Sequence, residues 1–185
     1  CAIPAFRGSY LSRGADEIVA EAQWLAEQGV NEVFLVSENT SSYGKDLGLG
    51  VDFAWLLEQV NAIPGEFLIR FMTSHPKDAG ARLFDTMAAC EKVAPVLHLP
   101  FQAGNDRVLK VMNRRHTREE YLAKIRDLKS LIPDIVLTSD VIVGFPGETE
   151  EDFEQTRDVF EKANYDMAYI FKYSVRSGTP AADRG

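Results

Sequence analysis

The segment 134–153 constrains the fold of this chain more than any other, because it predicts a buried strand, a tight turn and the start of a helix. Its apolar run is rich in β-branched residues, as expected for a strand covered on both faces of a parallel sheet. Gly144 and Gly147 flank a Phe-Pro pair, and this composition favours a tight turn that lets backbone approach a ligand closely. Thr149 and Asp152 have the spacing of a helix capping box. We therefore expect one βα unit with a ligand at the carboxyl end of its strand.

Three polar residues, Thr138, Ser139 and Asp140, interrupt this apolar run. A polar group that is buried without a partner costs about 1–3 kcal/mol, so each side chain needs something to meet it. We expect all three to face a lumen or cleft that holds a polar ligand. Ser139 and Asp140 are therefore candidates for binding a cofactor or a substrate.

The composition excludes several classes of protein. The 185 residues are 45% hydrophobic and 26% charged, which suits one domain with a real core and not a disordered or fibrous chain. There is neither a secretory leader nor an apolar run near the roughly 20 residues of a membrane span, so we expect a soluble, cytoplasmic protein without membrane contact. A net charge of -8 argues against a protein surface that binds nucleic acid by overall positive charge, so any RNA contact must be local.

Two cysteines, Cys1 and Cys90, are too few for a disulfide scaffold. Cys90 follows small apolar residues at a predicted helix end, where we expect a structural role. Cys1 by itself supports no metal site, because one cysteine gives no ligand spacing. Since the chain opens on cysteine and not on methionine, we expect a fragment of a longer protein.

Strands and helices alternate along the chain. The patterns predict strands at 33–36, 67–72, 93–99, 134–143 and 167–173, and helices at 16–28, 51–60, 79–90, 106–113, 118–130 and 150–163. Such alternation predicts a parallel sheet with right-handed crossovers. Polar residues follow the strands, so we expect the functional face at their carboxyl ends. Five strands cannot close an eight-stranded barrel, which leaves a partial barrel or a doubly wound sheet.

Several segments resemble the radical S-adenosylmethionine methylthiotransferases. The opening CAIPAFRGSYLSR is similar to the end of that family's C-x-x-x-C-x-x-C loop, with Cys1 in the place of the third cysteine. Later segments match in order: SENTSSYG, FMTSHPKD, LHLPFQAGNDRVLKVMNRRHTREEYL, TSDVIVGFPGETEEDF and FKYSVRSGTPAA. The likeness is strongest to the MiaB-type enzymes that act on tRNA, although SENTSSYG is as close to the branch that modifies an aspartate of a ribosomal protein.

The resemblance implies an α/β fold, a partial parallel (β/α)6 barrel of the radical S-adenosylmethionine type whose first strand would precede residue 1. Residues 1–185 would then be a single radical-domain fragment. An N-terminal auxiliary-cluster domain and a C-terminal RNA-binding TRAM domain would lie outside it. The fragment alone should not complete the reaction.

The resemblance also implies cofactors and a reaction. Cys1 would be one of three cysteines binding a 4Fe-4S cluster whose open iron chelates S-adenosylmethionine. Electrons from a donor such as flavodoxin would cleave that molecule to methionine and a 5′-deoxyadenosyl radical. The substrate would be C2 of an isopentenyl-modified adenosine beside a tRNA anticodon. A second 4Fe-4S cluster on the N-terminal domain would supply sulfur, and another S-adenosylmethionine the methyl group.

The family match assigns roles to residues at two strand ends. Ser37, Glu38 and Asn39 match the segment that meets the cofactor's methionyl amino group, although such residues are also common in turns and helix caps. Gln102 is the preferred candidate for a ribose contact. His98 is a possible ligand or base, but a lone histidine in a strand is more often a hydrogen-bonded core residue.

Apolar residues near the last two strands are candidates for holding adenine. Val143 and Phe145, on either side of Gly144, would offer backbone and an apolar face, and Phe171 and Tyr173 would complete the pocket. Plain core packing is the alternative, since aromatic residues dominate protein cores.

One basic cluster stands out in this acidic chain, and it consists of Arg107, Lys110, Arg114, Arg115, His116 and Arg118. The arginines and the lysine are candidates for contacting RNA, because phosphate contacts need only local positive charge. The alternative is a solvated helix face paired with Asp106, Glu119 and Glu120.

Two other classes of function remain open. One is a non-radical α/β enzyme that binds a phosphorylated small molecule at the GFPGET turn. The other is a catalytically inactive barrel that only binds a partner.

Overall fold

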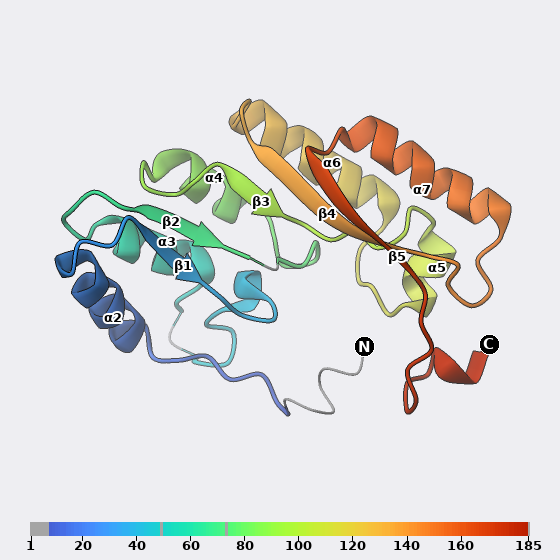
Figure 1. Cartoon of the computed structure of the whole chain (residues 1–185), viewed down its shortest axis with the longest axis horizontal. Helices are drawn as coiled ribbons and strands as arrows, with labels where there is room; N and C mark the ends of the chain where they lie inside the picture. The colour runs from blue at the N-terminus through green and yellow to red at the C-terminus, as the bar shows by residue number, and fades with distance from the viewer. Residues whose placement is uncertain (1–7, 49, 73, 185) are drawn as a thin grey trace.

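A computed structural model describes residues 8–48, 50–72 and 74–184, and in this part of the chain parallel strands alternate with helices (Figure 1). The strands are β1 (Glu32–Leu35), β2 (Leu68–Phe71), β3 (Val96–His98), β4 (Val136–Val143) and β5 (Met167–Lys172). The α-helices are α2 (Ala15–Glu27), α3 (Phe53–Asn61), α4 (Ala81–Ala89), α5 (Asp106–Val111), α6 (Arg118–Leu131) and α7 (Glu150–Ala163). Two 3-10 turns are η1 (Thr40–Ser42) and η2 (Ala182–Arg184). The predicted alternation is confirmed.

The strands follow one another in sequence order across the sheet. β1 pairs in parallel with β2, and β3, β4 and β5 form a parallel set in which β4 is central. A parallel bridge between Ile69 and Val93 joins the two sets. Sequential order without reversal excludes the doubly wound alternative, and the described strands form an open sheet, consistent with a partial barrel.

The third strand is shorter than predicted, because Pro95 interrupts it. The predicted range 93–99 contains an isolated bridge at Val93 and then the ladder of β3, which begins at Val96. Proline has no backbone N–H to donate, so the ladder cannot run through it. Its carbonyl still accepts a hydrogen bond from the backbone N–H of Val136.

One face of the sheet carries the main core, whose strand residues are at most 5% exposed: Val33, Ile69, Leu97, Leu137 and Val141. We call the other the open face, and on it Phe34, Leu68, Val136 and Tyr169 are between 39% and 48% exposed. The expectation that the 134–143 strand is covered on both faces is therefore wrong. Its side chains alternate between the core and the open face, as in any strand with one buried side.

The segment after β4 matches its prediction. Thr149 and Asp152 form a capping box at the start of α7, in which the Thr149 hydroxyl accepts from the Asp152 N–H and the Asp152 carboxylate accepts from the Thr149 N–H. Gly144 and Gly147 have φ of 69° and 80°, a region that L side chains rarely adopt. Among the described residues, no helix has both the length and the apolar composition to cross a bilayer.

Candidate functional site

A polar cluster lies on the open face, beside the end of β3 and the middle of β4. The Nδ1 atom of His98 is 2.8 Å from the Thr138 hydroxyl, and its Nε2 atom is 3.4 Å from a carboxylate oxygen of Asp140. Because a carboxylate only accepts hydrogen bonds, we assign the ring hydrogen to Nε2 and let Nδ1 accept from Thr138. The ring also makes an edge contact with Tyr169 on β5, with centroids 6.3 Å apart. His98, Thr138 and Asp140 thus lie side by side on the open face.

Ser139 is placed differently from its two polar neighbours. Alternation along β4 turns it to the core, where it is fully buried. Its hydroxyl donates to the Leu99 carbonyl at 3.0 Å and accepts from the Phe101 N–H at 3.2 Å. The expectation that Thr138, Ser139 and Asp140 share one polar face needs this correction, since protein groups already satisfy the Ser139 hydroxyl.

Arg114 joins the same cluster from the segment that follows α5. It is half-buried, and within the described part of the chain its guanidinium makes no hydrogen bond or ion pair. Burial lowers the pKa of Arg114, while the Asp140 carboxylate acts on that pKa in the opposite direction. A desolvated, unpaired guanidinium beside one carboxylate is a favourable place for an anionic group.

Two histidines, His75 and His116, lie near enough to Arg114 for its charge to act on them. The rings of His75 and His116 have centroids 6.0 Å apart. Burial, reinforced by the charge of Arg114, lowers the pKa of each imidazole to about 4, so both are neutral at pH 7. The Ser74 hydroxyl and both ring nitrogens of His116 are buried without a hydrogen-bond partner among the described residues. These unsatisfied polar atoms fit a ligand that carries its own donors and acceptors.

Gln102 has the most unusual backbone near the site. Its φ is 70° although it is not glycine, and it is 6% exposed. Its N–H donates to the Asp140 carbonyl at 2.9 Å, and its own carbonyl accepts from the Ile142 N–H at 3.0 Å. Left-handed backbone at a non-glycine residue is costly and concentrates at functional sites. Gln102 thus stays a candidate for a ligand contact.

The segment after β1 holds Ser37, Glu38 and Asn39. The Asn39 N–H donates to the Ser37 hydroxyl at 3.3 Å. The Asn39 side chain is fully engaged, because its amide nitrogen donates to Ser42 and Asp78, both at 2.6 Å, and its oxygen accepts from the His75 N–H at 3.2 Å. A cofactor contact stays a prediction for all three residues, and Asn39 also holds this loop to the loop after β2.

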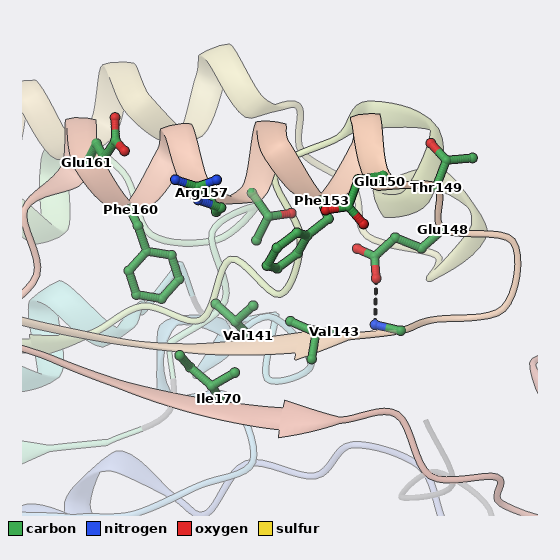
Figure 2. Close-up of a pocket in the computed structure, with 12 residues that line it drawn as sticks. Val141, Val143, Glu148, Thr149, Glu150, Phe153, Arg157, Phe160, Glu161 and Ile170 are labelled. Carbon is green, nitrogen blue, oxygen red and sulfur yellow. Dashed lines mark hydrogen bonds between the residues drawn. The ribbon is translucent and has the colours of Figure 1, made fainter.

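The apolar candidates do not gather their side chains in one place. The Phe145 and Tyr173 rings pack edge to face, with centroids 5.2 Å apart, in a small cluster at the carboxyl end of β4. Phe171 lies on the open face and is 53% exposed. The Val143 side chain instead lines a groove under α7 (Figure 2). A shared adenine pocket remains a prediction for these residues.

The groove in Figure 2 has a volume of about 600 Å³ and lies between α7 and strands β4 and β5. Figure 2 also shows how the turn before α7 is held, because the Glu148 carboxylate accepts from the Gly144 N–H at 2.6 Å. The same oxygen accepts from the Phe145 N–H at 3.2 Å. A carboxylate of the chain thus occupies the position that a phosphate would take at this turn.

The basic candidates other than Arg114 divide into two kinds. Arg107 forms an ion pair with Asp152 and donates to the Gly147 carbonyl at 2.8 Å, and Arg118 forms an ion pair with Asp158. The helix-face alternative thus describes these two arginines, although with partners other than those expected. Lys110 and Arg115 are exposed, and neither forms an ion pair with a described residue. An RNA contact remains a prediction for all five.

The expected cluster ligand, Cys1, lies outside the described residues. Cys90 is a free, buried thiol, and burial raises its pKa, which makes thiolate ligation unfavourable there. Among the described residues, no three His, Cys, Asp or Glu side chains group in a way that could hold a metal ion.

Comparison with known proteins connects this geometry to a family. The model of the Radical SAM superfamily matches residues 1–160. The chain belongs to this superfamily. Among solved structures, coproporphyrinogen III oxidase from Escherichia coli, described as a radical SAM enzyme, aligns with a TM-score of 0.66 at 17% identity, covering 92% of this chain and 40% of that one. The radical S-adenosylmethionine methyltransferase TsrM from Kitasatospora setae aligns with a TM-score of 0.67 at 18% identity, covering 86% and 31%.

Sequence relatives are more similar but longer. A tRNA-2-methylthio-N(6)-dimethylallyladenosine synthase of Acetivibrio thermocellus is 54% identical over 182 residues, which is 98% of this chain and 38% of the relative. The synthase of the same name from Alkaliphilus oremlandii is 53% identical over 182 residues, 98% of this chain and 39% of the relative. This radical SAM chain therefore spans about two fifths of the length of the curated relatives it matches.

Residue patterns missed part of the site. The basic neighbours of Arg114 favour an RNA contact, although the fold half-buries Arg114 and lets its charge interact with that of Asp140. Asp78 received no role, although it binds three side chains from another loop. The available signal was the polar run after the second predicted strand, Ser74 to Asp78.

Proposed function

We propose that this chain is the radical domain of a tRNA methylthiotransferase that converts N6-isopentenyladenosine, next to the anticodon, to its 2-methylthio derivative. The observation that carries the proposal is the polar cluster of His98, Thr138 and Asp140 on the open face, near enough to the half-buried Arg114 for the charges of Arg114 and Asp140 to interact. A site with one unpaired cation and one carboxylate suits a zwitterionic, hydroxyl-rich molecule such as S-adenosylmethionine. The names of the relatives favour tRNA over a ribosomal protein as the substrate.

Different residues of the chain would bind different parts of the cofactor. Arg114 would bind its carboxylate, and the segment from Ser37 to Asn39 its amino group. Asp140, beside His98, and Gln102 would hold the ribose hydroxyls. Accepting groups held in place before the ligand arrives bind it at a smaller entropic cost.

A 4Fe-4S cluster and S-adenosylmethionine would together supply the radical chemistry. Cys1 would be the contribution of this chain to the cluster. The remaining parts of our proposal are an auxiliary-cluster domain before the chain, a TRAM domain after it, a donor such as flavodoxin and a cytoplasmic location. The contribution of the described residues is to bind, orient and shield the cofactor at the strand ends.

The runner-up, a phosphate-binding enzyme without iron, is disfavoured by the turn before α7. Its N–H groups at Gly144 and Phe145 already donate to the carboxylate of Glu148. A phosphate would have to displace that carboxylate and would meet its negative charge.

The decisive test uses the full-length parent protein, reconstituted anaerobically, and measures its S-adenosylmethionine binding together with its iron and sulfide content. We expect binding by the unaltered protein, a loss of about tenfold or more in Arg114→Gln, and less than a twofold change in the control Arg126→Gln. Arg126 suits as a control because it is exposed and pairs only with the exposed Glu119 in the described chain. Nucleoside analysis of treated tRNA then tests the product. A protein without iron, or one that binds no S-adenosylmethionine, would rule out the proposal.

A further inference from the structure

Three side chains lie side by side across neighbouring strands on the open face. His98 lies at the end of β3, Asp140 lies in the middle of β4, and Tyr169 on β5 is directly opposite Asp140. The Nε2 atom of His98 is 3.4 Å from a carboxylate oxygen of Asp140, and the His98 ring makes an edge contact with the Tyr169 ring. We call His98, Asp140 and Tyr169 the open-face row.

Exposure rises along the open-face row toward the edge of the sheet. The side chain of His98 is 10% exposed and that of Asp140 is 27% exposed, whereas Tyr169 is 48% exposed. Figure 1 shows β5 at the outer edge of its described set of strands, beyond β4. A flat ligand that enters from this edge therefore meets the Tyr169 ring before it reaches Asp140.

The segment that carries Tyr169 differs in charge from the rest of this acidic chain. Residues 167–182 contain no Asp or Glu, and they include Lys172 and Arg176 together with aromatic residues. Both basic side chains are exposed, and neither forms an ion pair with a described residue. Aromatic rings stack on bases and local positive charge attracts phosphate, so this composition fits contact with RNA.

The position of Asp140 connects Tyr169 to the reacting part of the cofactor. In the proposed function, Asp140 holds the ribose of S-adenosylmethionine, and the reacting carbon of that molecule is the 5′ carbon of the same ribose. Because reacting atoms must come within about 3–3.5 Å of each other, the target base has to lie against this ribose. Neighbouring strands are only about 4.7–4.9 Å apart, so Tyr169 adjoins the space that the base must occupy.

The adenine of the cofactor itself is expected at a different level of the sheet. Its candidate residues begin at Val143, three residues beyond Asp140 at the end of β4. A strand rises about 3.3 Å per residue, which separates these two levels by about 10 Å. An exposed ring at the level of Asp140 therefore suits a second ring system, which is that of the substrate.

We propose that Tyr169 stacks on the purine base of the RNA substrate and so holds that base beside the ribose of S-adenosylmethionine. The inference rests on the proposed function, and it adds a residue of this chain that recognises the base. Stacking depends on the ring and not on the phenol hydroxyl. Tyr169→Phe should therefore retain the contact, and Tyr169→Ala should lose it.

The test measures RNA binding by the full-length parent protein, reconstituted anaerobically and saturated with S-adenosylmethionine. One probe is an anticodon stem-loop that carries N6-isopentenyladenosine, and the other is the same stem-loop with an abasic site at that position. We expect Tyr169→Ala to raise the Kd of the first probe about tenfold and that of the second less than about twofold. The Kd of S-adenosylmethionine should also change by less than about twofold.

Two further variants make this comparison sharper. Trp24→Ala is the matched control, because Trp24 is an aromatic residue on α2 that is 57% exposed and lies outside the open-face row. It should leave the binding of both probes unchanged. Tyr169→Leu covers the case in which Tyr169→Ala does not fold, because it keeps an apolar side chain on β5 and still removes the ring. We expect it to show the same preference between the two probes.

The outcomes separate this inference from the proposed function. Equal losses for both stem-loops, no loss for either, or a loss in Tyr169→Phe as large as in Tyr169→Ala would each overturn the stacking role. Weaker binding of S-adenosylmethionine by Tyr169→Ala would place Tyr169 in the cofactor site and would also overturn it. In all these cases the proposed function stands. Failure of the unaltered protein to bind S-adenosylmethionine overturns the proposed function and the role of Tyr169 together.

Discussion

The hydroxyl of Tyr165 donates a hydrogen bond to the hydroxyl of Tyr121, 2.8 Å away, in the core on the helix-covered face of the sheet. Tyr121 in turn donates to the Leu99 carbonyl at 2.8 Å, an acceptor that it shares with Ser139. Burial raises the pKa of both phenols, so both remain protonated at any pH at which the protein is handled. The chain of bonds runs one way, from Tyr165 to Tyr121 to the backbone that precedes Gln102.

This direction predicts unequal effects of two similar substitutions. Tyr165→Phe removes a donor and leaves the Tyr121 hydroxyl its bond to Leu99, which should cost about 1 kcal/mol of unfolding free energy. Tyr121→Phe leaves the Tyr165 hydroxyl without its acceptor and should cost about 2 kcal/mol. Urea denaturation followed by circular dichroism measures both. Equal losses would mean that the network does not have this polarity.

The two histidines beside Arg114 predict acid sensitivity in a defined range. His75 and His116 have pKa values of about 4 in the folded chain, whereas an unfolded histidine titrates near 6.5. The unfolded state therefore takes up protons first, and the free energy of unfolding falls as pH drops from about 6.5 to about 4. We expect a loss of about 3 kcal/mol, most of it from the buried His116, since one pKa unit corresponds to about 1.4 kcal/mol and solvent screens the partly exposed His75.

Denaturation at pH 7.5, 5.5 and 4.5 checks this expectation. The double variant His75→Gln and His116→Gln should be less stable at pH 7.5 but should lose less stability over that range. Carboxylates with lowered pKa, such as Asp78 and Asp152, titrate below it and do not interfere. If the double variant loses as much unfolding free energy between pH 7.5 and 4.5 as the unaltered protein, the acid sensitivity does not come from these two histidines.

Gly104 marks a close approach between the start of α5 and the side of α7. A Cβ atom built there would lie 2.3 Å from the Gln155 carbonyl oxygen and 2.5 Å from Cα of Thr156, and backbone cannot yield as a side chain can. The Gly104 N–H donates to the Thr156 hydroxyl at 2.9 Å, so the contact is also bonded. Gly104→Ala should cost about 3 kcal/mol. At Gly80, a Cβ atom would meet no atom within 4 Å apart from its chain neighbours. Gly80→Ala should therefore change the free energy of unfolding by no more than about 1 kcal/mol.

Local patterns predicted the parts of the fold that local interactions determine. The capping box of Thr149 and Asp152 forms as expected, and the predicted helix 150–163 has the same ends in the structure. Capping depends on residues three apart, so a single sequence contains the information it needs. The alternation of strands and helices depends equally on short-range periodicity, and it was enough to indicate a parallel sheet.

The site was harder to predict because its members are distant in sequence. Asp78 meets Asn39 only after β1 and β2 pair, and no spacing rule connects them. Arg114 and Asp140 interact electrostatically across 26 residues of sequence, and the basic run around Arg114 gives no sign of it. Ser139 is a different case. Successive side chains of a strand point to opposite faces of the sheet, so Ser139 and Asp140 cannot share a face, although the three consecutive polar residues suggest that they do.

The split among the basic residues predicts which of them contact tRNA. Lys110 and Arg115 are exposed and unpaired among the described side chains, so replacing either with alanine should weaken tRNA binding about threefold to tenfold and lower the salt slope by about 1. Arg107 is already bound to Asp152 and the Gly147 carbonyl. Its replacement should mainly lower thermal stability, because the capping carboxylate of α7 loses a partner.

Binding of tRNA at 50, 100 and 200 mM salt measures the slopes, with Arg126→Ala as the control. Arg126 pairs with Glu119 on the exposed side of α6, and its loss should leave the slope unchanged. A uniform decrease in tRNA affinity for all of these variants would indicate bulk electrostatic attraction, which the net charge of -8 argues against. An unchanged slope for both Lys110→Ala and Arg115→Ala would instead mean that RNA meets another surface. Only a loss confined to Lys110 and Arg115 supports a local contact at the end of α5.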